Sequence, residues 1–464
     1  MSIKNKGIHT ITYNGLLQIA GWIAMLGLCI FFYKERACYS DGSDLLIRMI
    51  VYEKPVNVMN RYLNHIVTIL PVIAVKMQWS LKTVMILYSL SPYLLLGIST
   101  IILYYVTENS FYTWIPLVAT VWWTNASFYY MIFEYFTMGL ALCLVLMLWN
   151  GIKSGKQKQF FIIGIIASFL MVMSHPLAIV VFLGGLGFLF IEFENERKNI
   201  VYLIIIVFVF YCINKWLKPF NPYESKIIDT LQENVKSWKT LDNAYFRNWL
   251  QSHYLNSIFY KTILIIIAGI LIARKKYALI LFFIIGTIIL HYSACLINYQ
   301  YGPTPYQELY YLIVGYFLIL AIFYALESMQ DIIRNTMLFL IVCYSLFNII
   351  LNAKPFAARI QSAENLIEQC IEQNTPKKIV IARDKAPRII VEDDWVFGME
   401  SIILSKLKGH DLAIVIKDNT EFVNDTASIV RKSDKIFIGE AMIKAPYLNL
   451  GFSYYQKVTL NDKK

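Results

Sequence analysis

The stretch Cys38–Tyr62, CYSDGSDLLIRMIVYEKPVNVMNRY, is a short polar segment in a chain that is otherwise mostly apolar. It follows the first hydrophobic segment of the chain and precedes a long series of others. Its charged side chains are Asp41, Asp44, Arg48, Glu53, Lys54 and Arg61. We therefore predict that this stretch is a loop which a hydrophobic scaffold holds at one surface of a membrane.

The composition indicates a polytopic α-helical membrane protein. The 464 residues are 58% hydrophobic and only 16% charged, whereas soluble domains carry about 25% charged residues. The mean hydropathy is +0.53, and runs without any charge recur, as at 200–213 and 263–273. These runs lack the alternation of a membrane barrel, so we predict helices, which satisfy their own backbone hydrogen bonds in lipid.

At about 20 residues per span, the apolar runs predict about eleven transmembrane helices. They lie near residues 14–33, 82–106, 111–126, 128–149, 159–173, 176–193, 199–217, 259–273, 277–297, 307–326 and 335–352. The first is too long for a signal peptide and has no cleavage site, so we expect it to be retained. The apolar segment His65–Ser80 is short, and Pro71 and Lys76 interrupt it, so we predict a helix lying in the interface.

Basic residues in short loops predict that the N-terminus is cytoplasmic. The segments then placed inside carry Lys4, Lys6, Lys153, Lys156, Lys158, Arg197, Lys198, Arg274, Lys275, Lys276 and Arg334. The outside receives the first loop (34–80), a long loop (218–258), the loop 298–306 and the C-terminal part. Lys34 and Arg36 oppose this assignment, because they directly follow the first helix on the outer side.

The C-terminal part, residues 355–464, predicts a small extracytoplasmic α/β domain beyond the transmembrane domain of residues 1–354. β-Branched runs at 377–382, 413–417 and 435–439 predict strands, and the region 396–408 between the first two has a helical pattern. No glycine-rich phosphate loop follows any of these strands, so we assign no nucleotide site. An accessory domain that caps the membrane part is the plainer interpretation.

The net charge of +11 is unevenly distributed. The segment from Pro355 onward contains 16 basic and 15 acidic residues, so almost the whole excess of positive charge lies in the membrane part. Basic residues commonly flank membrane helices, and they also attract anionic lipid head groups or lipid phosphates. Nothing in the sequence indicates nucleic-acid binding.

Asp41 and Asp44 form the strongest candidate for chemistry. Their spacing places both carboxylates on one side of a helical turn, or on a turn that binds one ligand, and Gly42 between them permits a tight bend. A carboxylate at a membrane surface can act as a general base, removing a proton from an acceptor hydroxyl or amine as that group attacks an activated sugar. The alternative is an ordinary polar turn between two helices.

Six further residues are candidates for substrate binding: Arg61, Glu134, His175, His291, Tyr301 and Glu308. Arginine can pair with a phosphate through two hydrogen bonds, but an interface arginine also snorkels without any ligand. Under the predicted topology Arg61, Glu134, His175 and Glu308 converge with the two aspartates at the outer surface, whereas His291 lies deeper. This convergence favours one outer active site over structural polar residues scattered to both faces.

No cofactor is assigned. The sequence has no metal-ligand motif such as HExxH, although its carboxylates and histidines leave a divalent cation open. The seven cysteines include no CxxC pair, and most read as small buried residues. Cys38 and Cys370 lie in polar regions, which leaves a disulfide between them open.

At this point the chain resembles the GT-C superfamily of membrane glycosyltransferases, such as the protein O-mannosyltransferases and the aminoarabinose lipid A transferases. YSDGSDLL (39–46), NRYLNHIVTILP (60–71) and LKTVMILYSLSPYLL (81–95) look like the first outer loop and second helix of those enzymes. EYFTMGLALCLVLMLWNGIKSGKQ (134–157) looks like their fourth helix and basic inner loop. As architecture the resemblance extends over about residues 10–350.

The resemblance implies a glycosyltransferase at the outer face of a bacterial inner membrane. The expected donor is a polyprenyl-phosphate sugar, and the expected acceptor is an envelope glycan, such as lipopolysaccharide or another polysaccharide, a lipid or a protein. The catalytic acidic residue carries over to Asp41, with Asp44 as its rival. The adjacent acidic pair of the family is absent here, because Gly42 and Ser43 intervene.

Two other functions compete with this one. A transporter or flippase of lipid-linked glycans predicts charges and broken helices at mid-membrane, often in two similar halves, and the sequence shows few such charges and no repeat. A non-catalytic GT-C-like scaffold predicts that the C-terminal domain matters and the two aspartates do not.

Overall fold

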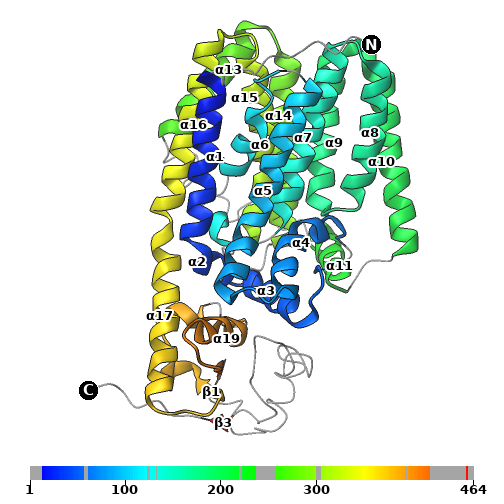
Figure 1. The fold of residues 1–464 in the computed structure, drawn as a ribbon. Helices are drawn as coiled ribbons and strands as arrows, with labels where there is room; N and C mark the ends of the chain where they lie inside the picture. Colours follow the sequence, from blue (N-terminus) through cyan, green and yellow to red (C-terminus); the bar gives the residue numbers. More distant parts are fainter. Residues whose placement is uncertain are drawn as a thin grey trace.

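The computed structural model describes residues 13–56, 61–107, 109–122, 126–131, 133–218, 222–236, 258–298, 305–392, 394, 396–418 and 456–457. Long helices form a bundle, and a smaller unit lies beyond one end of it (Figure 1). The bundle contains α1 (Tyr13–Phe31), α5 (Leu81–Thr107), α6 (Trp114–Val121), α7 (Glu134–Lys153), α8 (Gln157–Val172), α9 (Pro176–Glu192), α10 (Arg197–Leu217), α13 (Ile258–Ala273), α14 (Tyr277–Asn298), α15 (Pro305–Leu326) and α16 (Asp331–Leu351).

Shorter elements lie at the end of the bundle that faces the smaller unit (Figure 1). They are α2 (Tyr33–Ala37), α3 (Asp41–Tyr52), α4 (Leu63–Lys76), η1 (Ala126–Tyr129) and α11 (Pro222–Lys236). The turn η2 (Glu194–Glu196) lies at the opposite end, where α9 meets α10. The predicted interface segment is thus a helix, α4, and the aspartate pair begins another, α3.

Helices long and apolar enough to cross a bilayer are present in the described part of the chain. There are five, at Asn14–Phe31, Leu81–Thr107, Phe136–Lys153, Glu194–Leu217 and Asp331–Glu372. Shorter apolar helices accompany them, at Leu63–Lys76, Gln157–Val172, Pro176–Glu192, Lys261–Ala273, Tyr277–Leu290 and Gly315–Leu326. The chain is therefore a helical membrane protein, as the composition predicts.

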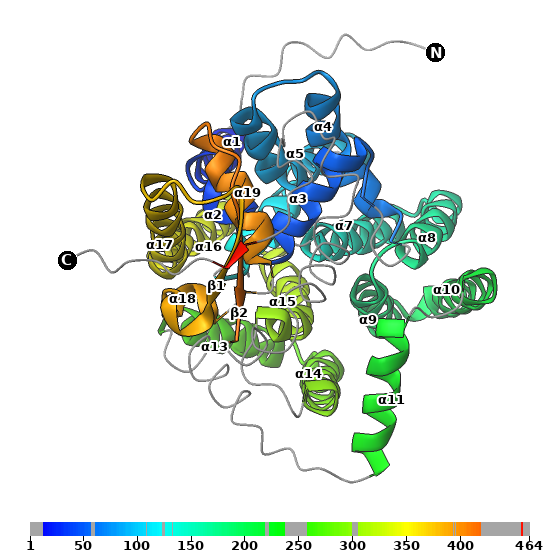
Figure 2. The same ribbon diagram turned by 90° about the horizontal axis from the view of Figure 1, so that it is seen from below.

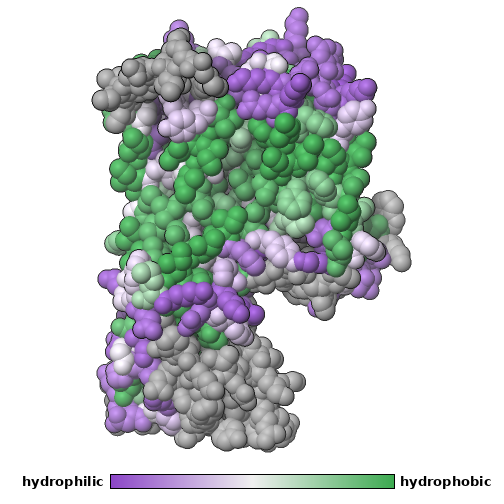
Figure 3. Space-filling view, turned by 45° about the vertical axis from the view of Figure 1, so that its right-hand side comes forward, coloured by the Kyte–Doolittle hydropathy of each residue, from purple (hydrophilic) through white to green (hydrophobic). Residues whose placement is uncertain are grey.

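The outer surface of the bundle agrees with a lipid environment. Large side chains such as Ile23, Ile265 and Ile332 are mostly exposed, which is unfavourable in water over so wide an area. Figure 3 shows a hydrophobic belt over this face of the bundle, with hydrophilic residues at both ends of it.

Each of the eleven predicted segments contains a helix, but α6 is much shorter than its predicted range of 111–126. Its eight residues, Trp114–Val121, are all buried, and eight helical residues extend only about 12 Å. An apolar run cannot reveal whether it faces lipid or protein. Here it faces protein, because α6 packs inside the bundle.

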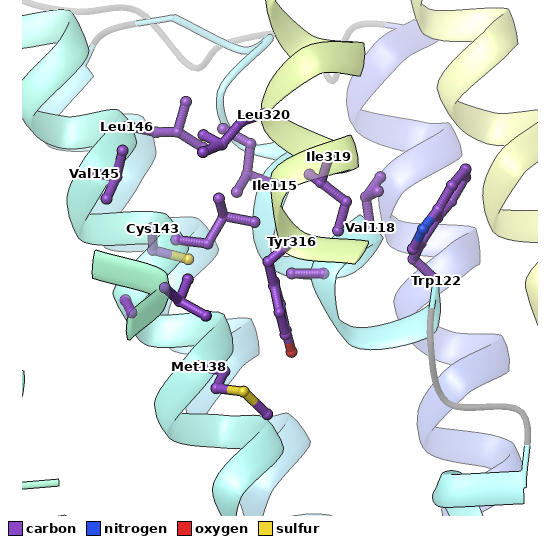
Figure 4. Close-up of a cluster of buried hydrophobic side chains, with 14 of the residues drawn as sticks. Ile115, Val118, Trp122, Met138, Cys143, Val145, Leu146, Tyr316, Ile319 and Leu320 are labelled. Carbon is purple, nitrogen blue, oxygen red and sulfur yellow. The ribbon is translucent and has the colours of Figure 1, made fainter. Parts of the chain in front are cut away.

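The centre of the bundle is a close-packed contact of α6, α7 and α15. Ile115 and Val118 on α6 face Tyr316 and Ile319 on α15, with Cys143 and Leu146 of α7 beside them; Trp122, Met138, Val145 and Leu320 complete the labelled cluster (Figure 4). All ten are at most 2% exposed. Loss of packing here destabilises the fold by roughly 2–5 kcal/mol per large side chain.

Basic residues at the end of the bundle away from α3 pair with carboxylates. Lys276 Nζ lies 3.0 Å from Glu192 Oε2, and Tyr324 Oη donates to Oε1 of the same carboxylate at 2.9 Å. Lys153 pairs in the same way with Glu327. These contacts join α7, α9, α14 and α15 at the end that the sequence predicts to be cytoplasmic.

The smaller unit contains α17 (Ala353–Glu372), β1 (Lys378–Ala382), η4 (Arg383–Lys385), α18 (Arg388–Val391), α19 (Phe397–Leu407), β2 (Ala413–Lys417) and β3 (Gln456–Lys457). The strands form a parallel sheet in the order β2-β1-β3, with Lys378 opposite Ala413. The first two strands and α19 lie at the predicted positions. The predicted strand at 435–439 lies outside the described residues.

Two features join this unit to the bundle. Helices α16 and α17 follow each other almost without a break over 42 residues, or about 63 Å, twice the hydrocarbon thickness of a bilayer. In addition, Leu46 of α3, Met85 of α5 and Ile402 of α19 belong to one hydrophobic core. The first loop and the smaller unit therefore share a core, and α3 and α19 lie side by side (Figure 2).

Candidate functional site

Asp41 and Asp44 both lie in the first turn of α3, as their spacing predicts. The helix dipole stabilises carboxylates there, and both residues are partly buried. Arg48 Nε donates to both oxygens of Asp44 at 2.9 Å. Asp44 is thus engaged in an ion pair on its own helix.

The residue before Asp41 has an unusual backbone. Ser40 has φ 48° and ψ −133°, a conformation that non-glycine residues avoid and that costs about 1–3 kcal/mol. Its side chain is only 1% exposed. Its hydroxyl lies 2.9 Å from Tyr130 Oη, and its carbonyl accepts from Ser43 N at 3.0 Å. The surroundings therefore hold Ser40 in this conformation and define where α3 begins.

Gly42 lies against two other segments. A Cβ at this position would be 2.7 Å from the carbonyl oxygen of Arg36 and 3.2 Å from Met131 Cβ. Tyr88 Oη of α5 donates to the Gly42 carbonyl at 3.1 Å. From the sequence we expect Gly42 to permit a tight bend. In the structure the residue is helical, and glycine is needed because there is no room for a Cβ.

Arg36 is a buried cation beneath the start of α3, with 1% of its surface exposed. Its guanidinium donates to Ser89 Oγ at 2.7 Å and to the Ser89 carbonyl at 3.2 Å. The remaining donors reach Tyr93 Oη, the Phe128 carbonyl and the sulfur of Met131. Among the described residues it forms no ion pair, so neutral groups alone solvate its charge.

Arg36 directly follows the first helix, and the charge rule counts it against the predicted topology. The charge rule treats such a residue as a charge in a loop. Arg36 instead joins the end of α1 to α5 and to the segment that precedes α7. Hydrogen bonds lower the cost of burying a polar group, and every guanidinium donor of Arg36 has an acceptor here.

A second group of polar residues forms where α4 begins. Leu63 N donates to the Met173 carbonyl at 3.4 Å, which brings the start of α4 to the turn between α8 and α9. Arg61 and His175 flank this contact, and burial together with the nearby Arg61 charge holds the pKa of His175 well below its usual range. The Nζ of Lys218, at the end of α10, lies 3.8 Å from the centroid of the Tyr62 ring.

His175 also has a local structural role. It is the N-cap of α9, where its Nδ1 accepts from Leu177 N at 3.1 Å. In the first turn of α4, His65 packs edge-on against Tyr62. The buried Nε2 of His65 has no hydrogen-bond partner among the described residues. We call Arg61, His65, His175 and Lys218 the basic group.

The other predicted site residues are placed by their helices. Glu134 is the first residue of α7, three positions after Met131, and Glu308 lies in the first turn of α15. His291 lies within α14, nearer its C-terminal end. Tyr301 lies outside the described residues. Among the described residues no group of three or more His, Cys, Asp and Glu is arranged to hold a metal ion.

The two cysteines considered for a disulfide, Cys38 and Cys370, are both free and buried. Burial, with a smaller contribution from the Glu400 carboxylate, raises the pKa of the Cys38 thiol. This thiol is therefore inert towards oxidation in the folded chain.

Sequence reasoning missed Ser40 and three residues that lie near the start of α3: Arg36, Tyr130 and Glu400. Ser40 N donates to Glu400 Oε1 at 3.2 Å across 360 positions of sequence. A charged residue inside the apolar pattern of α19 is the one signal that could have indicated Glu400. Comparison with protein-family models, curated proteins and solved structures finds no match for this chain.

Proposed function

We propose that this protein is a GT-C-like membrane glycosyltransferase which transfers a sugar from a polyprenyl-phosphate donor to an envelope acceptor. The observation that carries the proposal is the placement of Asp41. It starts α3 at the same end of the bundle as the basic group, immediately after a strained residue. Strained backbone next to a partly buried carboxylate is common at active sites.

In this reaction Asp41 is the general base. Its carboxylate accepts the proton of the acceptor hydroxyl or amine as that atom attacks the anomeric carbon of the sugar. The bond between that carbon and the phosphate oxygen breaks, and its electron pair leaves with the lipid phosphate. Attack opposite to the leaving phosphate inverts the anomeric configuration.

The basic group supports the same reaction from the donor side. Arg61 offers a planar set of donors that matches phosphate oxygens, and Lys218 adds a second positive charge nearby. A positive charge placed where the lipid phosphate departs stabilises the transition state. The neutral His175 supplies no charge and caps α9 instead.

We also propose that the α3 end faces outward and that the bundle spans the bacterial inner membrane with about eleven helices. The paired Lys153 and Lys276 then lie on the cytoplasmic side, in agreement with the charge rule. Residues from α17 onward extend into the extracytoplasmic space, because α16 alone is long enough to cross the bilayer.

The test is the Asp41→Asn variant, expressed at normal level in the native host. Envelope glycans and polyprenyl-phosphate sugars are profiled by mass spectrometry and compared with a deletion strain. We expect one sugar to be missing from a glycan and a lipid-linked donor to accumulate, as in the deletion. The control is Asp331→Asn, which removes an exposed carboxylate at the other end of the bundle and should leave the profile unchanged.

If Asp41→Asn and the double variant with Asp44→Asn both match the wild type while the deletion does not, the catalytic proposal is wrong. Truncation of the C-terminal unit then tests the scaffold. Transport of radiolabelled lipid-linked glycan in proteoliposomes tests the flippase.

A further inference from the structure

Ser40 lies where three separate parts of the chain meet. Its hydroxyl contacts Tyr130 in the segment before α7, and its carbonyl accepts from the start of α3. Its N–H donates to Glu400, which belongs to α19 of the smaller unit. A strained residue keeps its conformation only when its surroundings over-determine it, so each of these contacts matters for Asp41.

Glu400 is well suited to hold a backbone N–H. It is 1% exposed, and its other oxygen accepts from Arg359 Nη2 at 2.8 Å. It lies in the first turn of α19, where the helix dipole stabilises a carboxylate. A buried and paired carboxylate has few alternative positions, and so it holds Ser40 rigidly.

Arg359 is fixed in turn. It is 4% exposed and donates to the carbonyls of Ile389 and Ile390 at 2.9 and 3.2 Å. Its guanidinium also lies 5.5 Å from the ring of Tyr39, the residue before Ser40. The pair Arg359–Glu400 thus contacts two consecutive residues: Glu400 accepts from Ser40 N, and Arg359 lies against the ring of Tyr39.

Other contacts hold the same two parts together. Phe356 of α17 stacks on Tyr129 at 4.4 Å and packs edge-on against Tyr39. Lys34 Nζ of α2 pairs with Glu364 of α17 at 2.7 Å. This second ion pair lies in the same interface but does not touch Ser40, so it provides a matched control.

We propose that Glu400 is a positioning residue for Asp41: the smaller unit, through Glu400, holds Ser40 in its strained conformation and so sets the position of the base. This inference rests on the proposed function. It gives the smaller unit a part in the reaction of the membrane domain. Rearrangement of α19 would then change activity without touching the substrate.

The backbone of Ser40 offers a direct test, because glycine adopts this conformation without strain. Glu400→Gln, in the full-length membrane protein, should lower glycan product about tenfold, the effect of about 1.4 kcal/mol at the site. Adding Ser40→Gly should restore most of the product, whereas adding Ser40→Val should not. Glu364→Gln should leave product near the wild-type level.

Cys38 gives a second readout that does not depend on catalysis. It is buried two residues before Ser40, so reaction with a membrane-impermeant maleimide reports loosening of this segment. We expect labelling to rise at least threefold in Glu400→Ala, whose level in the membrane is checked separately. Labelling should stay at the wild-type level in Asp41→Asn and in Glu364→Gln.

The outcomes separate the two proposals. If Asp41→Asn abolishes product but Glu400→Gln and Glu400→Ala match the wild type in product and in labelling, Glu400 does not position the base and only this inference is overturned. If adding Ser40→Gly to the Glu400→Gln variant fails to restore product, Glu400 does not act through the backbone conformation of Ser40. The inference is then also overturned. If Asp41→Asn itself keeps full product, the proposed function is the one that fails, and the catalytic role of Glu400 fails with it.

Discussion

Arg48 Nε donates to both carboxylate oxygens of Asp44, one turn earlier on α3, at 2.9 Å each. The spacing of four residues is the usual one for an ion pair along a helix. Half of the Arg48 side chain is exposed, so the pair contributes only about 0.3–0.5 kcal/mol. The contact nevertheless gives Asp44 a role in the structure of α3, which differs from the role proposed for its rival, Asp41.

The first prediction concerns this difference. We expect Asp44→Asn and Arg48→Gln to keep at least half of the wild-type glycan product, because both only break a weak surface pair. Asp41→Asn should reduce product at least a hundredfold, the usual range for loss of a general base. Mass spectrometry of envelope glycans measures all three, and a loss in Asp44→Asn as large as that in Asp41→Asn would make Asp44 the base.

The second prediction concerns Gly42. Alanine there places a methyl group 2.7 Å from a backbone oxygen, and such overpacking costs about 1–3 kcal/mol. Gly42→Ala should therefore lower the thermal midpoint in detergent and also lower product. Gly97→Ala on α5 is the control, since its new Cβ meets nothing within 4 Å. Equal melting of Gly42→Ala and wild type would contradict the close approach.

The third prediction concerns Arg36. Replacement by Met removes five donors and leaves buried acceptors unsatisfied, so we expect a loss of about 3 kcal/mol or more. Arg36→Lys should recover little of this stability, because a single ammonium group cannot bind all the acceptors that surround the guanidinium. Thermal unfolding of the purified protein measures both variants, with the exposed Arg48→Lys as the tolerated counterpart. Wild-type stability in Arg36→Lys would show that the charge alone suffices.

The fourth prediction is a pH dependence. The pKa of His175 is lowered in the folded chain, so below about pH 6.5 the unfolded chain binds a proton that the folded chain does not. Protonation at Nδ1 also removes the acceptor that caps α9. Stability should therefore fall as pH drops below about 6.5.

His175→Asn isolates this effect, because asparagine caps a helix without titrating. The variant should match the wild type at pH 7.5 and melt at a higher temperature than the wild type at pH 5.5. If both proteins lose the same stability between these pH values, His175 is not the cause of the acid sensitivity.

The fifth prediction concerns topology. Ser154 lies in the turn between α7 and α8, and Gln361 lies exposed on α17. An impermeant maleimide should label Gln361→Cys in cells with a permeabilised outer membrane, and Ser154→Cys only after the inner membrane is opened. The unsubstituted chain reports background labelling of the native cysteines. Labelling in the reverse order would invert the orientation.

Local sequence was sufficient for the elements themselves. Hydropathy over windows of about 20 residues located the long helices. The segment that Pro71 and Lys76 interrupt is a helix, α4, and its position in the membrane interface stays a prediction. The β-branched runs located β1 and β2. For Asp41 and Asp44 the spacing left two arrangements open, and the structure has the first of them, a shared helical turn. Each of these properties depends on residues close together in the chain.

The surroundings of Asp41 depended on the tertiary structure. The burial of Arg36, the strain at Ser40 and the contact with Glu400 join segments up to 360 positions apart, and no window of sequence contains both partners. The short buried α6 was misjudged in length for a similar reason, since hydropathy cannot distinguish lipid from a protein interior. The sequence by itself therefore determined which segments are helices in a membrane. Only the tertiary structure decided which charges are buried and which residue precedes the base, because those depend on packing between distant parts of the chain.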